Sequence, residues 1–332
     1  MSDTDAAVAR QGVVEVAAAL TARWIRDERS IEAGLPVEDA GADDGASDGV
    51  AIVEGEVAGA RAALGVVALF DVDGDDEFVA RKRLIEAALS ERVEGAVALW
   101  TPPGAALAAD GVEGLVDRVA ERVASLDAGE RGEVAFPVPV GVRKMDGEGS
   151  YLSAVGGLAS QWARFTNQVF GQYQLDSSAI HRLPEDPEAV TQLVDFLVLV
   201  ANGIREVGKS VEVSSEDTWV VQRLEEGSRA RVIAAPANSD ADEASAVRKR
   251  LRAGMGEAVR VLAEREVELR MMTFVGVVGS MEGERASVAL RGLDPSLFAH
   301  LDAAFLAADG KLKRLFGPKP GSVLGRKKAT DA

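Results

Sequence analysis

The chain has 332 residues, of which 47% are hydrophobic and 27% are charged. It is therefore too apolar for general disorder and long enough for two or three domains. It contains no cysteine and only two histidines, which excludes disulfides, thiolate nucleophiles, iron–sulfur clusters and cysteine-type zinc sites. The net charge of −17 disfavours binding to nucleic acid or to an anionic membrane.

Strand-like and helix-like segments alternate in the first part of the chain, which predicts an α/β domain over residues 1–148, with a mixed sheet and flanking helices. The apolar spacing of Val13, Val16, Leu20 and Trp24 indicates the first helix. The expected helices are 13–30, 77–91 and 112–126, and the expected strands are 50–57, 65–72, 95–100 and 133–142.

The middle segment, residues 149–236, is predicted to combine helices with a short β meander. Its clearest signal is the run Asp186, Pro187 and Glu188, which is typical of a helix start. That helix should reach about Glu206, and its apolar residues occupy more than one face, so we expect it to be nearly enclosed. Other expectations are a helix over 157–170, an irregular or extended segment over 173–184 and strands at 211–213, 218–224 and 229–234.

The remaining chain is predicted as an α+β segment over 242–316 and a flexible basic tail over 317–332. The expected elements are a helix over 243–264, strands over 267–278 and 285–290, and a last helix over 297–308. Seven basic residues and no acidic residue lie between Lys311 and Lys328. Such a segment could contact an anionic partner.

Residues 203–210 match the phosphate-loop pattern, with Gly203, Gly208, Lys209 and Ser210 at its defining positions. A phosphate loop follows a strand and opens a helix, because the helix N-terminus supplies much of the anion site. Here a helix is expected before the loop and a strand after it. The match is therefore interpreted as a decoy, and no cofactor is predicted.

An apolar run ends in Asp71 and Asp73, and about thirty residues later a second apolar run ends in Thr101. This pattern resembles the first two motifs of the haloacid-dehalogenase-like phosphohydrolases. The resemblance implies a nucleophilic Asp71, an acid/base Asp73 and a bound Mg²⁺. Asp75 stands where that family has threonine.

If 50–57 and 65–72 form a hairpin, Glu54 with Glu56 and Asp71 with Asp73 each lie on one face of it. These four carboxylates are candidate metal ligands, in an arrangement that resembles the restriction-endonuclease-like core. The lysine that such a nuclease needs is absent from its expected position, which Asp73 occupies.

A polar and aromatic cluster in the middle segment is a candidate binding patch. It contains Tyr173, Asp176, Ser177, His181 and Arg182. A single histidine near an aspartate more often forms a structural hydrogen bond than a catalytic pair.

Each catalytic motif lacks a required partner, so the sequence predicts a non-catalytic interaction protein or a subunit of a cytoplasmic complex. The alternatives are a magnesium-dependent phosphohydrolase and a degenerate nucleotide or nucleic-acid binder. The expected partner is another protein or a second copy of the chain. Nucleic acid is expected only through the basic tail. No signal peptide and no membrane-spanning run is recognised, so a cytoplasmic location without membrane contact is expected.

Overall fold

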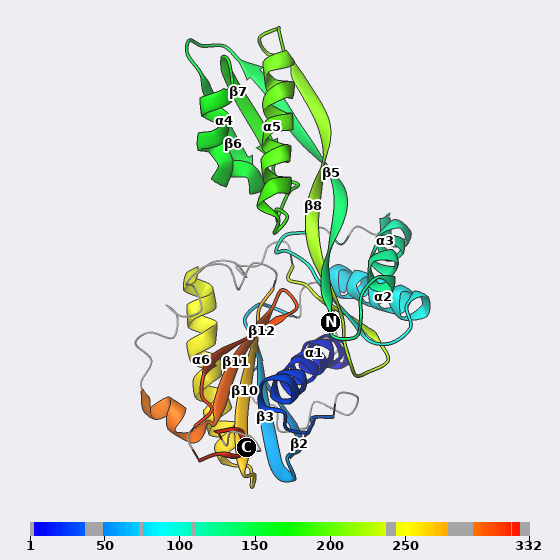
Figure 1. Ribbon diagram of the computed structural model, residues 1–332, viewed down its shortest axis with the longest axis vertical. Coiled ribbons are helices and arrows are strands. Elements are labelled where there is room, and N and C mark those ends of the chain that lie inside the picture. Colours follow the sequence, from blue (N-terminus) through cyan, green and yellow to red (C-terminus); the bar gives the residue numbers. More distant parts are fainter. Residues whose placement is uncertain are drawn as a thin grey trace, which may run out of the picture. The chain divides into compact units, whose positions relative to one another are not determined.

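Figure 1 shows the computed structural model of the chain, which describes residues 3–36, 49–72, 76–105, 107, 111–236, 244–277, 295–319 and 321–325. The α-helices are α1 (Asp3–Arg29), α2 (Asp76–Arg92), α3 (Val112–Ala124), α4 (Trp162–Gln168), α5 (Pro187–Gly203) and α6 (Ala244–Ala263). The strands are β1 (Ala33–Gly34), β2 (Val50–Val57), β3 (Ala60–Ala68), β4 (Val97–Trp100), β5 (Arg131–Met145), β6 (Tyr151–Gly156), β7 (Gln172–Ser177), β8 (Ser210–Arg223), β9 (Ala230–Ile233), β10 (Leu269–Val275), β11 (Ala303–Ala308) and β12 (Lys311–Phe316). Short 3-10 turns lie at η2 (Gly157–Gln161), η3 (Pro295–His300) and η4 (Val323–Gly325).

The chain folds into two compact units. The first, called the body below, contains residues 1–132 and 220–332, and the second, called the insert, contains residues 133–219. These limits differ from the predicted segments, which were divided at 148, 236 and 316. The physical reason is that both crossings fall inside continuous strands, β5 and β8, where neither a polar linker nor a change in composition marks a boundary.

The body contains a mixed six-stranded sheet in the order β1-β2-β3-β10-β11-β12. The β2–β3 and β11–β12 pairs are antiparallel, whereas β10 runs parallel to both β3 and β11. Helix α1 covers one face of this sheet and α6 covers the other (Figure 1). The predicted α/β class, with a mixed sheet and flanking helices, is confirmed.

Helix α1 is buried on nearly all sides because it lies between two sheets. Its small residues, such as Ala17, Ala18 and Ala22, are fully buried and permit close approach of the strands. The same core contains Phe305 from the first sheet and Trp100 from β4 in the second. That second sheet has the order β6-β7-β5-β8-β4-β9.

The insert is built from strands of the second sheet, with α4 and α5 on one face (Figure 1). Asp186 caps α5 by accepting a hydrogen bond from Glu188 N at 2.9 Å, and Pro187 occupies the first turn. The predicted start of this helix is confirmed. Val194, Leu197 and Ala201 of α5 pack onto the core of the insert.

The predicted last helix was wrong. Residues 297–308 form η3 followed by strand β11, whose six residues are all buried. A short, uniformly apolar run does not distinguish a buried strand from a helix. The segment over 173–184, expected to be irregular or extended, begins with strand β7, in which Tyr173, Leu175 and Ser177 alternate inward.

The meander predicted from separate strands at 211–213 and 218–224 is instead a single long strand, β8. The predicted strand pair that includes residues 285–290 lies outside the described residues.

The predicted tail is not independent of the fold over its described part. The basic residues Lys311, Lys313 and Arg314, which precede the predicted tail, belong to β12, an edge strand, where basic side chains discourage pairing with other sheets. Leu324 is fully buried in the core that contains α1. A single buried leucine in a short segment produces no apolar periodicity, so the sequence shows no sign of this contact. Residues 326–332 lie outside the described residues.

Candidate functional site

The two apolar runs that resemble phosphohydrolase motifs belong to different sheets. Asp71 follows β3 of the first sheet, and Thr101 follows β4 of the second. Motifs that build one site at the carboxyl ends of strands need a shared sheet edge, which these strands do not have. Asp73 lies outside the described residues.

The acidic residues of the predicted hairpin do not converge on one site. The hairpin itself is confirmed, and Glu56 lies opposite Arg61 near its turn. Asp71 lies beyond the other end, where Val50 pairs with Val67. Glu54 forms an ion pair with Arg265 at 3.2 Å. Among the described residues, no group of three or more Asp, Glu or His side chains is placed to hold a metal ion.

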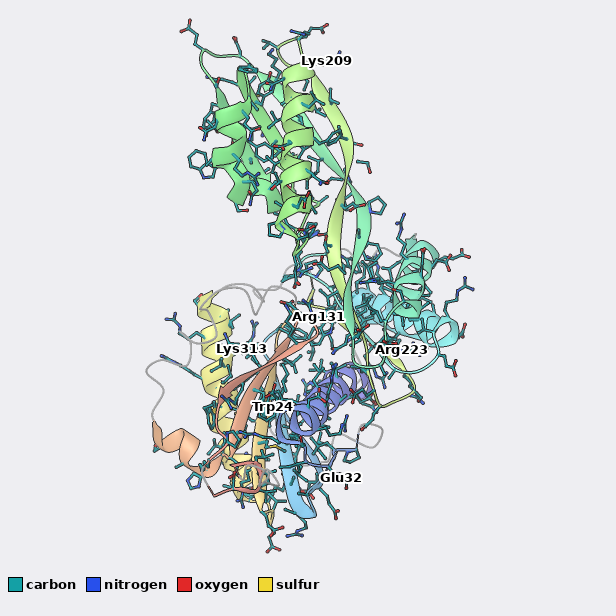
Figure 2. All side chains as sticks on the ribbon, in the orientation of Figure 1. Trp24, Glu32, Arg131, Lys209, Arg223 and Lys313 are labelled. Atoms are coloured by element: carbon teal, nitrogen blue, oxygen red, sulfur yellow. The ribbon has the colours of Figure 1, made fainter. Side chains whose placement is uncertain are left out.

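The phosphate-loop match has the reversed order expected from the sequence. Gly203 ends α5, Gly208 has a φ of 82°, and Ser210 begins β8. Lys209 lies in the connection between the two, at one end of the insert (Figure 2). The backbone around Lys209 is engaged with β5, because its carbonyl accepts a hydrogen bond from Lys144 N at 3.0 Å.

The candidate binding patch consists mainly of residues that hold the insert together. Tyr173 is buried and donates its hydroxyl to Phe170 O at 3.0 Å. Ser177 is fully buried and donates to Val155 O at 2.6 Å. Asp176 is exposed and accepts two hydrogen bonds from Ser178. These contacts support a structural role for the three side chains.

His181 and Arg182 meet on a carboxylate that the sequence did not single out, Asp217. Its oxygens accept hydrogen bonds from His181 N at 2.8 Å, from Arg182 N at 2.9 Å and from Trp219 Nε1 at 2.9 Å. His181 Nδ1 lies 3.1 Å from the same carboxylate. Asp217 is 35 residues or more from His181 and Arg182 in the chain, so no local pattern predicts this cluster.

The environment of Asp217 favours its charged form. Burial alone would raise the pKa of this carboxyl, but the hydrogen bonds from His181, Trp219 and Arg182 outweigh burial and hold the pKa below its ordinary value of 3.8. Arg182 is itself paired with Glu133 at 2.7 Å and with Glu185 at 2.9 Å. The cluster therefore anchors the segment before α5 to β5 and β8.

The surface of the insert is unusually apolar. Eight of the nine large apolar side chains that are exposed among the described residues belong to it, although it contains about a quarter of the chain. They are Met145, Tyr151, Val155, Trp162, Phe170, Phe196, Leu199 and Val207; the ninth is Leu84 in the body. The exposed Phe196 and Leu199 also show that α5 is not enclosed as predicted.

Four of these side chains lie on or next to the helices of the insert and define what we call the α4–α5 face: Trp162, Phe170, Phe196 and Leu199. The exposed fractions of these residues are 55%, 77%, 46% and 72%. Monomeric proteins rarely expose such apolar groups together.

Hydrogen bonds bring the two halves of this face together. Phe196, Leu199 and Asn202 are spaced three residues apart on α5 and so form one stripe. Asn202 donates to Gln168 O at 3.1 Å and accepts from Phe170 N at 2.7 Å. The end of α4 and Phe170 are therefore fixed beside the apolar stripe of α5.

Charges of both signs occur on the two helices that carry the α4–α5 face. Arg164 is the charged residue of α4, and Asp195, which is exposed, precedes Phe196 on α5.

Neither a membrane-spanning helix nor a similar known protein points to a function. Among the described residues, no helix is long and apolar enough to cross a membrane. Comparisons with protein-family models, with curated proteins and with solved structures found no match for this chain.

Proposed function

We propose that the chain is a non-catalytic interaction protein that assembles through the α4–α5 face, and that the partner on this face is a second copy of the chain. The observation that carries the proposal is the concentration of exposed apolar side chains on the insert. A cytoplasmic location stays a prediction from the sequence.

The free energies of burial and of association favour a partner whose contact surface is equally apolar. Burying what is now exposed of Trp162, Phe170, Phe196 and Leu199 would contribute roughly 4–7 kcal/mol per copy. Association costs about 4–15 kcal/mol in lost translational and rotational freedom. One such face against a polar surface barely offsets this cost, whereas two such faces against each other supply about twice as much. Aromatic side chains are also enriched at the centres of protein interfaces.

The charges favour a second copy as this partner. A protein with a net charge of −17 repels its own copies unless the contact surface is nearly neutral. In a two-fold contact, every pair of touching residues occurs twice: if a residue of one copy touches a residue of the other, the same pair also meets with the two copies exchanged. In the proposed dimer, Asp195 of one copy meets Arg164 of the other copy, and the reverse.

Charge reversal at this pair tests the proposal. The dissociation constant of the dimer is measured by sedimentation equilibrium of the full chain. We expect Asp195→Arg and Arg164→Asp each to weaken the dimer about tenfold or more, and the double variant to recover most of the loss. Arg92→Asp is the matched control, because its ion pair with Asp117 lies in the body and both side chains are more than half exposed.

Two results would overturn the proposal. The first is a wild-type chain that stays monomeric at every accessible concentration. The second is a dimer that none of the variants on the α4–α5 face affects.

A further inference from the structure

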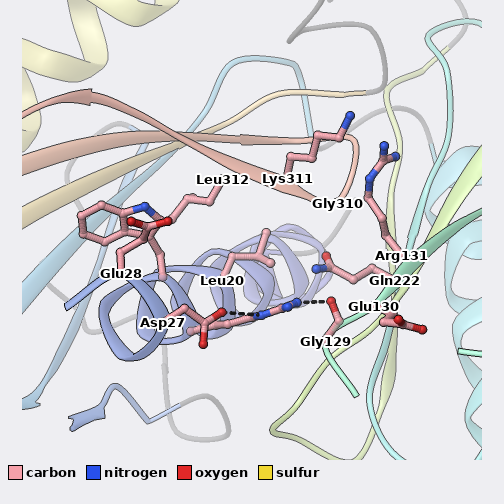
Figure 3. A pocket seen from close by; sticks show the side chains of 12 residues that line it. Leu20, Asp27, Glu28, Gly129, Glu130, Arg131, Gln222, Gly310, Lys311 and Leu312 are labelled. Atoms are coloured by element: carbon pink, nitrogen blue, oxygen red, sulfur yellow. Dashed lines mark hydrogen bonds and ion pairs between the residues drawn. The ribbon is translucent and has the colours of Figure 1, made fainter. Parts of the chain in front are cut away.

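The body contains a pocket of about 420 Å³ between α1, the residues that lead into β5, the end of β8 and the β11–β12 turn (Figure 3). Its volume is within the range of about 300–1,000 Å³ that is usual for small-molecule sites. All of its lining residues belong to the body, and the α4–α5 face takes no part in it.

The floor of the pocket holds a polar atom that needs a partner. Gln222 is 2% exposed, and within the described residues its Oε1 has no hydrogen-bond partner. A buried acceptor of this kind is costly unless a donor reaches it. Gly310 lies next to this acceptor: a Cβ at this position would stand 3.4 Å from Gln222 Oε1.

Both signs of charge line the pocket. Arg131, Lys311 and Glu130 lie on the same side as Gln222, whereas Asp27 and Glu28 lie at the other side (Figure 3). Arg23, which also lines the pocket, pairs with Asp27 at 3.2 Å. The Arg131 side chain also reaches Asp309 O, at 3.4 Å.

Apolar groups lie between these two ends. Leu20 and Leu312 are placed there (Figure 3), and Trp24 also lines the pocket. Trp24 is fixed by its contact with Phe305, with ring centres 4.8 Å apart.

We propose that this pocket binds a free α-amino acid with an apolar side chain. The carboxylate pairs with Arg131 and Lys311, and the neighbouring ammonium group donates a hydrogen bond to Gln222 Oε1. The side chain of the ligand lies along Leu20 and Leu312. An ammonium group fits better than a hydroxyl, because Glu130, on the same side of the pocket as Gln222 (Figure 3), favours positive charge on the donor.

Calorimetric titration of the full chain with leucine tests the site. Two analogues each change one group: 4-methylpentanoate lacks the ammonium group, and leucinamide lacks the carboxylate. We expect leucine to bind and each analogue to bind about tenfold more weakly or worse, as the loss of a charge-assisted hydrogen bond or of the carboxylate–Arg131/Lys311 interaction implies. 2-Hydroxy-4-methylpentanoate decides between a hydroxyl and an ammonium donor.

Variants separate binding from folding. Gln222→Leu should weaken leucine binding about tenfold or more. The same change removes the unpartnered acceptor, so the melting temperature of the ligand-free protein should stay the same or rise. Lys311→Met changes an exposed residue and should also weaken binding. Lys313→Met, on the same strand (Figure 2), does not touch the pocket and is the matched control.

Failure of leucine and phenylalanine to bind the wild-type chain would overturn the proposal. Binding that survives both Gln222→Leu and Lys311→Met would also overturn it. Tighter binding of the hydroxy acid would assign the pocket to hydroxy acids instead. None of these results depends on the oligomeric state, so they are distinct from a failure of the α4–α5 face.

Discussion

Asp217 joins the segment before α5 to β8 through hydrogen bonds from both His181 and Arg182, and its titration should make the stability of the insert depend on pH. Its pKa is lowered in the folded chain, so its stabilising effect is fully present above the ordinary value of 3.8 and is lost as the pH falls through the lower, folded value.

Asp217→Asn should lower the free energy of unfolding by about 1–3 kcal/mol at neutral pH. The difference from the wild type should shrink as the pH falls below 3.8, because the unfolded wild-type chain then binds a proton at Asp217 that the folded chain binds only at lower pH. Urea unfolding over a series of pH values measures it. Asp117→Asn, which affects an exposed ion pair with Arg92, should change stability by less than about 1 kcal/mol. A loss for Asp217→Asn that is the same at every pH would contradict the assignment.

A buried ion pair joins α1 to β9 in the body. Arg231 Nε lies 2.5 Å from Glu15 Oε2, and Nη2 lies 2.8 Å from Oε1. Burial disfavours the charged guanidinium, but the hydrogen bond and charge of Glu15 outweigh this and raise the pKa of Arg231.

Glu15→Ala should lower the free energy of unfolding by about 3–5 kcal/mol, because it leaves a buried cation without its partner. The double variant Glu15→Leu with Arg231→Met should lose less than the single variant, since no charge is then left buried alone. Denaturant unfolding of both proteins measures the difference. A double variant that is less stable than Glu15→Ala would show that the pair is worth more than its desolvation.

Helix α5 has a buried side and an exposed side, and the exposed fraction of its side chains changes sharply between two leucines that are two residues apart. Leu197 is 1% exposed and Leu199 is 72% exposed. Leu197→Ala should lower the free energy of unfolding by about 2–5 kcal/mol, because it leaves a cavity in the core of the insert. Leu199→Ala should cost less than about 0.5 kcal/mol at concentrations where the chain is monomeric. Thermal or urea unfolding of the two variants checks this, and equal losses would contradict the packing described for α5.

Elements with strong local signals were predicted well from the sequence. The cap at Asp186 and Pro187 marks the start of α5, and the β2 limits of Val50 and Val57 agree with the predicted strand. In each case the deciding interactions lie within a few residues of one another. Local patterns therefore carry the information that fixes these limits.

Elements that depend on distant neighbours were predicted poorly. Strand β11 is uniformly buried because β10 and β12 flank it and a core covers each face, and nothing in its own sequence distinguishes it from a helix. The candidate sites have the same difficulty. Gln222, Arg131 and Lys311 come from three separated segments, and Asp217 reaches His181 only through the pairing of strands.

At the scale of the whole molecule, the insert interrupts the chain of the body between residues 132 and 220. The chain crosses the boundary twice, and both crossings fall within continuous strands. A unit of this kind suits the presentation of an interaction surface, because the surface is placed on regular elements rather than on loops.

The central claim is that the α4–α5 face is covered by a second copy of the chain. The chain has no cysteine, so Leu199→Cys and Leu84→Cys each introduce a single thiol without background. Both native side chains are more than half exposed, but only Leu199 lies on the α4–α5 face. The rate at which a maleimide labels each thiol, measured over a range of protein concentrations, reports directly whether the face is covered.

Labelling at position 199 should slow about tenfold or more as the concentration rises through the dissociation constant of the dimer, because burial of the face blocks the reagent. Labelling at position 84 should proceed at the same rate throughout. A rate at position 199 that is independent of protein concentration up to the solubility limit would contradict self-association through this face.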